Sequence, residues 1–596
     1  PVNQPGPLVG LQCTAGDRHK QGRAVMTAAF ESGFRLIYKP KSLAADYHLQ
    51  RLLEWVNERG AEPQFKTLRV IDRGSYGWSE FVEATACQST EQVERFYRRQ
   101  GGYLALLYMM EATDFHYENL IAAGEHPMLI DIESLFHPRV GEAVAAARPW
   151  DFFAGAILNS SVLRVGLLPQ RLHFKPSDKG VDLSGLGASA GQLTPCDIPY
   201  WEQDGTDEMH IARKRMTMPT GRNRPFLNGR EVDTLEYGDA IVRGFTDTYR
   251  LVLKHREELL AEDGPLAAFL DDEVRIIVRP TSTYGLLLHD SFHPHVLRNA
   301  LDRDRFLDRL WRGIESQPYL SRVIQAELHD LQQGDIPIFT TRPGSLDIWT
   351  SAGERIPRFL DQSGMTLVHQ RVGQLSEQDL KRQEWIIRAS LASSAIAEKR
   401  EPLQPDASRK PRAAVPREQL IAIASAIGDR LEELAFKEKE NISWIGLTFI
   451  DDETCSLLPM SYGLYSGTSG VALYLAYLAH LTGEPRHLML AQAASRSLTA
   501  PLSNLDERSV ASLFNSIGAF EGCGSLIYTL THLGQLWQQP ELLAQAESLV
   551  RFLPPLIYKD ERFDIMSGAA GLIAALLALH QCRPNSATLQ AVIACG

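Results

Sequence analysis

Asp114 and Asn119 lie five residues apart in the stretch DFHYEN, which follows a long helical pattern. Twelve residues after Asn119, the strand-like run MLIDIE brings Asp131 and Glu133, and upstream the strand-like run RLIYK ends at Lys39. Phosphoryl transfer needs a carboxylate beside the attacking hydroxyl, Asn and Asp oxygens for magnesium, and a cation for the phosphates. The order Lys, Asp with Asn, then Asp therefore predicts a kinase-like site.

The segments around these residues predict the small lobe of such a site. Residues 22–39 have the alternation of a β-hairpin, and apolar residues in the range 44–57 recur at helical spacing. Glu54 or Glu58 on this helix could pair with Lys39, but a solvated helix face is the favoured reading for both. The pattern gives strand, lysine and helix in the order that a kinase small lobe uses.

Further elements are expected on both sides of the catalytic stretch. Residues 67–83 predict two more strands, and residues 90–111 predict a helix, interrupted at Gly101-Gly102, that leads into the loop. The polar segment GVDLSGLGASAGQLTP, residues 180–195, is expected to be a flexible, activation-loop-like region or an insertion. Residues 271–288 predict an apolar strand that carries Arg275, Arg279 and Thr281, and helices are expected from there to about Glu398.

A change of character after residue 400 predicts a second domain. Residues 399–417 are charged and hold four prolines, so we divide the chain into a domain 1–400, a linker 401–417 and a domain 418–596. In the second domain Gly467, Gly522 and Gly568, spaced 55 and 46 residues apart, each precede an apolar helix. This repeat predicts an array of helical hairpins, with too few repeats to close a ring.

Bulk composition excludes several classes of function. The 596 residues carry a net charge of -12 with a pI near 5.8, which argues against a nucleic-acid partner. The seven cysteines are scattered, as in a reduced cytoplasmic protein. No apolar run reaches the roughly 20 residues of a membrane span, and no signal peptide opens the chain. Because the chain starts without Met and stops inside a helical pattern, we expect a piece of a larger protein.

Five stretches and the glycine-turn helices give the sequence a family resemblance. Together they closely resemble class II lanthipeptide synthetases. The five stretches are GDRHKQGRAV (16–25), YKPKSL (38–43), DFHYENLIAAGEHPMLIDIESLFHP (114–138), VRPTSTY (278–284) and GDIPIFTTRPGS (334–345). The resemblance implies an α+β fold, with a lipid-kinase-like bilobal dehydratase domain followed by an all-α partial (α/α) toroid. It also implies ATP-dependent phosphorylation of Ser and Thr in a precursor peptide, phosphate elimination to dehydroamino acids, and thioether rings made by the complete cyclase.

The same resemblance implies a role for individual residues. In the phosphorylation step, these would be Lys39 for the phosphates, Asp114 for the substrate hydroxyl with His116 beside it, and Asn119 and Asp131 for magnesium with Glu133 beside them. In the elimination step, they would be Asp17 and His19 of the GDRH turn, together with Arg275 and Thr281. Arg279 is an alternative to Arg275, since only a pattern separates the two.

The implied cofactors are ATP and Mg²⁺, with Zn²⁺ only in a complete cyclase domain. The family's zinc ligands, two Cys and one His, would lie beyond Gly596, so no zinc site is assigned to Cys523, Cys582, Cys595, His480 or His580. The expected partners are a ribosomal precursor peptide with its leader and, as a further option, an export transporter. Family members also carry a further N-terminal portion ahead of the GDRH turn.

Two other classes of function compete with this reading. One is a small-molecule or lipid kinase without elimination activity, which would have no need of the GDRH turn or the RIIVRPT strand. The other is a non-catalytic scaffold, which would have no need to keep competent residue types at Lys39, Asp114, Asn119 and Asp131.

Overall fold

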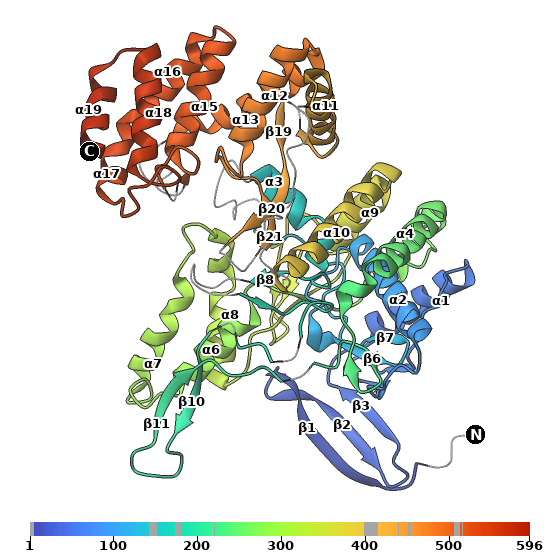
Figure 1. Ribbon diagram of the computed structural model, residues 1–596. Helices are drawn as coiled ribbons and strands as arrows, with labels where there is room; N and C mark the ends of the chain where they lie inside the picture. The colour runs from blue at the N-terminus through green and yellow to red at the C-terminus, as the bar shows by residue number, and fades with distance from the viewer. Residues whose placement is uncertain are drawn as a thin grey trace. The chain divides into compact units, whose positions relative to one another are not determined.

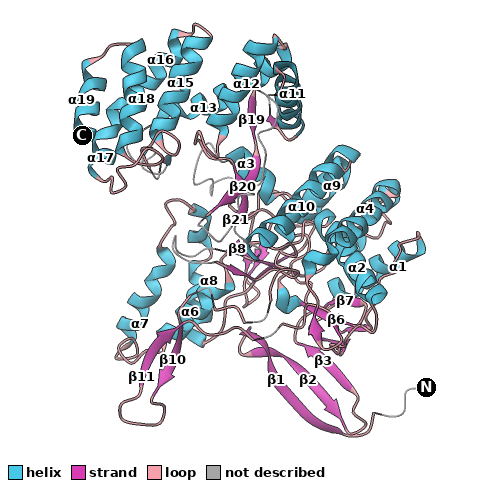
Figure 2. Ribbon diagram, viewed as in Figure 1, coloured by secondary structure: helices cyan, strands magenta, loops and turns pink. Residues whose placement is uncertain are grey.

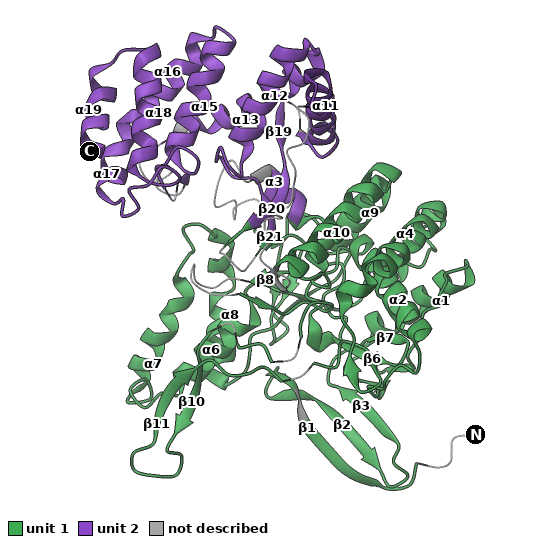
Figure 3. Cartoon of the chain, viewed as in Figure 1, with its two compact units in different colours: residues 1–145, 159–399, 449–456 green, residues 146–158, 400–448, 457–596 purple. Residues whose placement is uncertain are grey.

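The computed structural model describes residues 5–141, 152–172, 180–189, 191–194, 196–219, 221–398, 415–438, 440–450, 455–505, 510, 513–514 and 516–596. The chain forms two compact units, coloured separately in Figure 3: residues 1–145, 159–399 and 449–456, and residues 146–158, 400–448 and 457–596. Most of the expected linker, residues 401–414, lies outside the described residues. The fold is a mixture of helices and strands, and the second unit is mainly helical (Figure 2).

A five-stranded antiparallel sheet opens the first unit, with the strand order β1-β2-β3-β5-β4. Its elements, in dark blue in Figure 1, are β1 (Leu8–His19), β2 (Arg23–Phe30), β3 (Arg35–Lys39), β4 (Val70–Asp72) and β5 (Gly77–Glu80), with α1 (Ala44–Glu58) between β3 and β4. The predicted hairpin, helix and two further strands are therefore confirmed. The helix forms because Leu49, Leu52, Leu53 and Val56 share one buried face.

One detail of the predicted turn is wrong. The residues GDRH do not form a turn, because Asp17 and His19 still belong to β1. The reversal comes at Lys20, Gln21 and Gly22, all of which have positive φ angles. Gly22, which has no Cβ atom, adopts this conformation with less backbone strain than other residues.

The helix that leads into the candidate catalytic loop, around residues 114–119, is continuous. α2 (Thr90–Met109) runs through Gly101-Gly102, so the predicted interruption is wrong. Both glycines are buried, and α4 (Gly238–Lys254) crosses α2 at this point. A Cβ atom on Gly101 would lie 2.0 Å from the carbonyl oxygen of Ile241, and one on Gly244 would lie 1.8 Å from that of Arg98. The glycines thus serve close backbone packing, which outweighs their cost in a helix.

Gly244→Ala should therefore separate α2 from α4. We expect a loss of about 3 kcal/mol in the free energy of unfolding, because the added methyl group overlaps backbone atoms that cannot rotate away. The matched control is Gly373→Ala in α9 (Gly364–Gln374), where an added Cβ has no neighbour within 4 Å. Urea denaturation of the two variants measures the difference. Equal midpoints for both variants would contradict this account of the crossing.

The remaining elements of residues 120–398 are short strands and helices. In chain order they are β6 (Leu120–Ala123), β7 (His126–Leu129), α3 (Phe152–Asn159), β8 (Arg171–Leu172), β9 (Val181–Asp182), β10 (Ile198–Glu202), β11 (His210–Lys214), β12 (Phe226–Leu227), β13 (Arg230–Glu231), α4, α5 (Arg256–Leu259), β14 (Val274–Ile276), α6 (Thr281–Ser291), α7 (Ala300–Leu307), α8 (Ile324–Gln333), β15 (Phe339–Thr341), β16 (Ile348–Trp349), β17 (Arg355–Ile356), α9 and α10 (Glu377–Glu398).

Two predicted strands end earlier than expected. β7 stops before Asp131, because the amide of Ile130 donates to the carbonyl of Asn119 (3.0 Å). β14 has only three residues, and Thr281 is the first residue of helix α6. Past β14, the amide of Ile277 donates to Nε2 of His137 (2.9 Å), and Pro280 has no amide to continue a ladder. The prediction that Arg279 and Thr281 lie on a strand is therefore wrong.

The polar segment at residues 180–195 packs against the catalytic loop. Val181, Leu186 and Ala188 are buried, and the amide of Tyr117 donates to the carbonyl of Leu183 (3.1 Å). Residues 181–188 therefore form a packed wall of the site, and the prediction of a flexible region is wrong for them. The composition of this segment was misleading, because it is rich in glycine and serine and contains only a few apolar residues, which are the ones that pack.

The second unit consists of helical hairpins. Its elements are α11 (Arg417–Glu433), α12 (Thr468–Thr482), α13 (Pro485–Thr499), α15 (Cys523–Leu536), α16 (Pro540–Leu549), α17 (Leu553–Tyr558), α18 (Ala569–Cys582) and α19 (Ser586–Cys595). The glycine-turn repeat is confirmed, since Gly467, Gly522 and Gly568 are the N-cap residues of α12, α15 and α18. A Cβ atom at any of them would lie 2.1–2.5 Å from backbone atoms of the preceding turn.

Two features complete this part of the chain. Two short strand pairs were not expected: β18 (Phe436–Glu438) with β19 (Asn441–Ser443), which are antiparallel, and β20 (Ile445–Phe449) with β21 (Cys455–Pro459). Cys523 is fully buried in the apolar core, and burial raises the pKa of its thiol to about 12. Among the described residues, no helix has the length and apolar character needed to cross a membrane.

Candidate active site

Lys39 is the last residue of β3, and its buried side chain makes two hydrogen bonds. Its Nζ donates to the carbonyl of Ile130 (2.8 Å) and to Oδ1 of Asp46 (3.0 Å) in the first turn of α1. The partner is therefore neither Glu54 nor Glu58, and Glu54 instead pairs with the exposed Arg51. The contact with Ile130 brings the lysine next to Asp131.

The catalytic loop follows α2 and is fixed by backbone contacts. Asp114 has a φ angle of 65°, a left-handed conformation that Asp tolerates better than most residues. The side-chain nitrogen Nδ2 of Asn119 donates to the carbonyl of Asp114 (2.7 Å). The side-chain oxygen of Asn119 takes no part in this hydrogen bond. His116 Nε2 lies 3.9 Å from Oδ1 of Asp114. Burial raises the pKa of Asp114, and the neighbouring His116 and Arg275 only partly offset this effect.

Glu133 is the centre of the charged cluster. One of its oxygens accepts a hydrogen bond from Nη1 of Arg275 (2.6 Å), and the other accepts one from Nζ of Lys41. Nζ of Lys41 also lies 3.3 Å from Oδ1 of Asp131. Burial alone would raise the pKa of Glu133, but Lys41 and Arg275 outweigh burial and hold this pKa well below its usual value. Glu133 is thus a charged anchor shared by two cations.

The two arginines considered from the sequence lie in different surroundings. Arg275 reaches from Glu133 to Thr281, whose Oγ1 accepts from Nη2 (2.9 Å). Arg279 instead donates to Oε1 of Glu327 (2.8 Å) and to the carbonyl of Leu310 (2.8 Å), away from the cluster. Arg275 therefore lies together with Thr281 and Glu133, whereas Arg279 pairs with a different buried carboxylate, Glu327.

His19 is half-buried at the end of β1, beside the same cluster. Its Nδ1 lies 2.7 Å from the carbonyl oxygen of Ile336. Because a carbonyl only accepts hydrogen bonds, Nδ1 carries the proton and Nε2 keeps a lone pair. Burial lowers the pKa of His19, and the positive charge of Arg275 adds to this effect. Asp17 lies on the same strand and is exposed.

Several supporting residues were not singled out from the sequence. Asp335 accepts hydrogen bonds from the amides of Gln21 (2.6 Å) and Gly22 (3.0 Å), so it fixes the β1–β2 turn beside His19. Glu111, at the start of the catalytic loop, is buried and pairs with Arg371 (2.7 Å) and Arg139 (3.3 Å). Asp335 lies in the motif GDIPIF. This motif contributed to the family resemblance, but the sequence did not indicate that its Asp holds the β1–β2 turn.

The oxygen donors fit a magnesium ion bound together with phosphate. Among the described residues, no group of three or more His, Cys, Asp or Glu side chains could hold a metal by itself. Mg²⁺ usually takes one or two carboxylates, and substrate phosphates and water complete its shell. Asp131 and Asn119 belong to neighbouring segments joined by the amide of Ile130, and Asp131 already has the cation Lys41 beside it. Asp131 is thus a carboxylate that already lies beside a positive charge.

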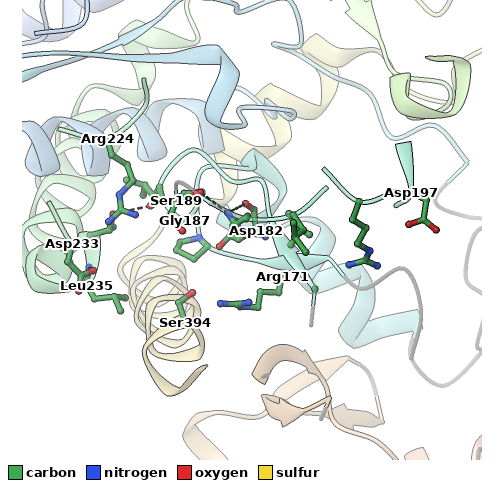
Figure 4. Close-up of a pocket in the computed structure, with 17 residues that line it drawn as sticks. Arg171, Asp182, Gly187, Ser189, Asp197, Arg224, Asp233, Leu235 and Ser394 are labelled. Atoms are coloured by element: carbon green, nitrogen blue, oxygen red, sulfur yellow. Dashed lines mark hydrogen bonds between the residues drawn. The ribbon is translucent and has the colours of Figure 1, made fainter. Parts of the chain in front are cut away.

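A separate cavity lies beyond the wall formed by residues 181–189. It has a volume of about 870 Å³, and none of the residues predicted for catalysis lines it. Figure 4 shows Arg224 and Asp233 at one end and Asp197 at the other. The charged cluster around Glu133, rather than this cavity, is therefore the candidate active site.

Comparisons with known proteins cover most of the chain. Residues 1–342 match the family described as a domain of unknown function, DUF4135, and residues 459–596 match the family described as lanthionine synthetase C-like protein. A curated relative is the lacticin 481/lactococcin biosynthesis protein LcnDR2 of Lactococcus lactis subsp. lactis. It is 27% identical over an alignment of 481 residues, and the match covers 77% of this chain and 49% of the relative. The chain therefore spans about half the length of the curated relative that it matches.

Proposed function

The chain belongs to the DUF4135 family, in the arrangement of the class II lanthipeptide synthetases, and we propose that its first unit is the dehydratase of lanthipeptide biosynthesis. This unit would phosphorylate Ser and Thr side chains of a precursor peptide with ATP and then eliminate the phosphate. The fold would be that of a lipid-kinase-like pair of lobes. The helical second unit would belong to the cyclase that forms thioether rings in the complete protein.

In the phosphorylation step the substrate hydroxyl oxygen attacks the terminal phosphorus of ATP, and ADP leaves. Asp114 would accept or orient the proton of this hydroxyl, and Lys39 would lie beside the phosphates. Asn119 and Asp131 would hold magnesium, which when bound would neutralise phosphate charge. The order of these residues along the chain and their convergence around Ile130 support the proposal.

In the elimination step a base removes the α-proton of the phosphorylated residue, the Cβ–O bond breaks, and phosphate leaves. Neutral His19 would supply a lone pair at Nε2 for this proton. Arg275 and Thr281 would hold the departing phosphate, since Arg offers five N–H donors and the hydroxyl that accepts from Arg275 can still donate. The products would be a dehydroamino acid and inorganic phosphate.

The observation that carries this proposal is the position of Glu133. It binds Arg275, assigned to elimination, and Lys41, which also contacts the proposed metal ligand Asp131. Groups for both steps therefore surround one carboxylate. A kinase that stops after phosphorylation would have no need of the Arg275–Thr281 pair at this position, so the arrangement favours a dehydratase.

The decisive experiment is intact-mass analysis of a precursor peptide after incubation with the chain, ATP and magnesium. The chain should add phosphate transiently and then remove the equivalent of one water per modified Ser or Thr. Phosphate gain without any later water loss would indicate the alternative, a kinase without elimination activity. A peptide of unchanged mass, under conditions where a complete relative modifies it, would contradict the proposal.

The state of His19 leads to a pH prediction. Its pKa is lowered by burial, so the imidazole should stay neutral at pH values where an ordinary histidine, with a pKa near 6.5, is half protonated. The elimination rate from a prephosphorylated peptide should therefore fall only below about pH 6.5. Rates measured between about pH 5 and pH 8 test this expectation. A midpoint at or above the ordinary histidine value would be inconsistent with His19 as the base.

A further inference from the structure

Lys41 is the cation in direct contact with the proposed metal ligand. It follows β3 in the motif YKPKSL, and its Nζ lies 3.3 Å from Oδ1 of Asp131 while donating to Oε2 of Glu133. The side chain of Lys41 is 24% exposed, whereas that of Lys39 is 7% exposed. Nζ of Lys39 donates its hydrogen bonds to the carbonyl of Ile130 and to Asp46. Lys41, rather than Lys39, is therefore the lysine that faces the two carboxylates.

The charge balance explains why a lysine stands at this point. Asp131 and Glu133 would repel each other if both faced the partly buried site without a cation between them. Burial alone would lower the pKa of Lys41, but the two carboxylates raise it, so the ammonium stays charged. Arg275 cannot replace Lys41, because Arg275 reaches Glu133 from the other side and donates to its other oxygen.

A divalent ion at Asp131 would meet this ammonium at short range. Two cations beside the same carboxylate repel each other, whichever of its oxygens the metal takes, so Lys41 on Asp131 would oppose metal binding. Lys41 can leave Asp131 without losing all its partners, since its hydrogen bond to Glu133 does not involve Asp131.

We propose that Lys41 is a positioning residue: it is the resident counter-ion of Asp131 and Glu133, it competes with the divalent ion for Asp131, and it stays on Glu133 once the ion binds. This inference rests on the proposed function, because it takes Asp131 as a metal ligand. A lysine that only stabilised the fold would not oppose metal binding. The two roles therefore predict opposite effects of removing Lys41.

The test uses Mn²⁺ as the probe and the whole chain without nucleotide, with free Mn²⁺ measured by electron paramagnetic resonance. Lys41→Ala should tighten Mn²⁺ binding by about tenfold, because Asp131 no longer has a competing cation. Lys41→Arg should restore the parent affinity, since it keeps the charge. Arg250→Ala is the control, because it removes the exposed pair between Arg250 and Glu377 far along the sequence from these residues.

Unchanged or weaker Mn²⁺ binding by Lys41→Ala would overturn the role of Lys41. If circular dichroism shows that Lys41→Ala is unfolded, Lys41→Gln provides the same comparison with most of the stem retained. The double variant Lys41→Ala/Asp131→Asn should lose the gain in affinity. If Mn²⁺ binds with ATP but Lys41→Ala does not tighten the nucleotide-free site, only the Lys41 proposal fails. If no form binds Mn²⁺ even with ATP, the proposed metal site fails as well.

Discussion

Asp131→Asn should lower peptide phosphorylation by at least about 100-fold, because phosphoryl transfer relies almost wholly on positioning and electrostatic stabilisation. The substitution keeps the size of the side chain but removes the charge that would face the metal. It also removes the carboxylate beside Lys41, whose remaining partner would be Glu133. The measurement is the rate of phosphate transfer from labelled ATP to the precursor peptide.

A matched control separates this effect from a general loss of charge. Asp239→Asn changes a carboxylate near the start of α4 that is 78% exposed and pairs with the exposed Arg388 of α10. This variant should phosphorylate the peptide at the parent rate, and thermal melting should show both variants folded. Parent-like phosphorylation by Asp131→Asn would rule out the proposed metal role of this residue.

Local patterns in the sequence were sufficient for much of the fold. The alternation in residues 22–39 and the helical spacing in residues 44–57 gave β2, β3 and α1. The glycine turns at Gly467, Gly522 and Gly568 gave the starts of three helices. Each of these signals lies within one element, so no knowledge of distant contacts was needed.

The predictions that proved wrong depend instead on contacts between distant parts of the chain. Gly101-Gly102 suggested a break in α2, yet the contact that makes them necessary is with α4, about 140 residues later in the chain. Thr281 looked like a strand residue, because nothing local reveals that Ile277 bonds to His137 instead of a neighbouring strand. Tertiary contacts of this kind override local propensity without leaving a local signal.

The candidate site shows the same division. The order of Lys39, Asp114, Asn119 and Asp131 along the chain could be read from the sequence, and their roles remain predictions. The choice between Arg275 and Arg279 could not be made from the sequence, because both residues lie in one short apolar run. Only their partners, Glu133 and Glu327, distinguish them.

Replacing Arg275 or Thr281 by Ala should separate the two proposed steps. Phosphorylation relies on Asp114 and the proposed metal ligands, whereas expulsion of phosphate needs donors on the departing oxygens. Arg275→Ala and Thr281→Ala should therefore leave phosphorylation within about tenfold of the parent rate and slow elimination by about 100-fold or more. Phosphorylated peptide would accumulate, and intact mass would report phosphate gained without water lost.

Two controls make this result specific. Thr281→Ser keeps the hydroxyl that accepts from Arg275 and should restore elimination, whereas Thr283→Ala changes an exposed threonine in the same first turn of α6 and should have no effect. Because Arg275 also neutralises Glu133, Arg275→Ala could disturb the carboxylate cluster, so Thr281→Ala is the cleaner variant. Fully dehydrated peptide from both alanine variants, or loss of phosphorylation in both, would show that the two steps do not divide between these residues as proposed.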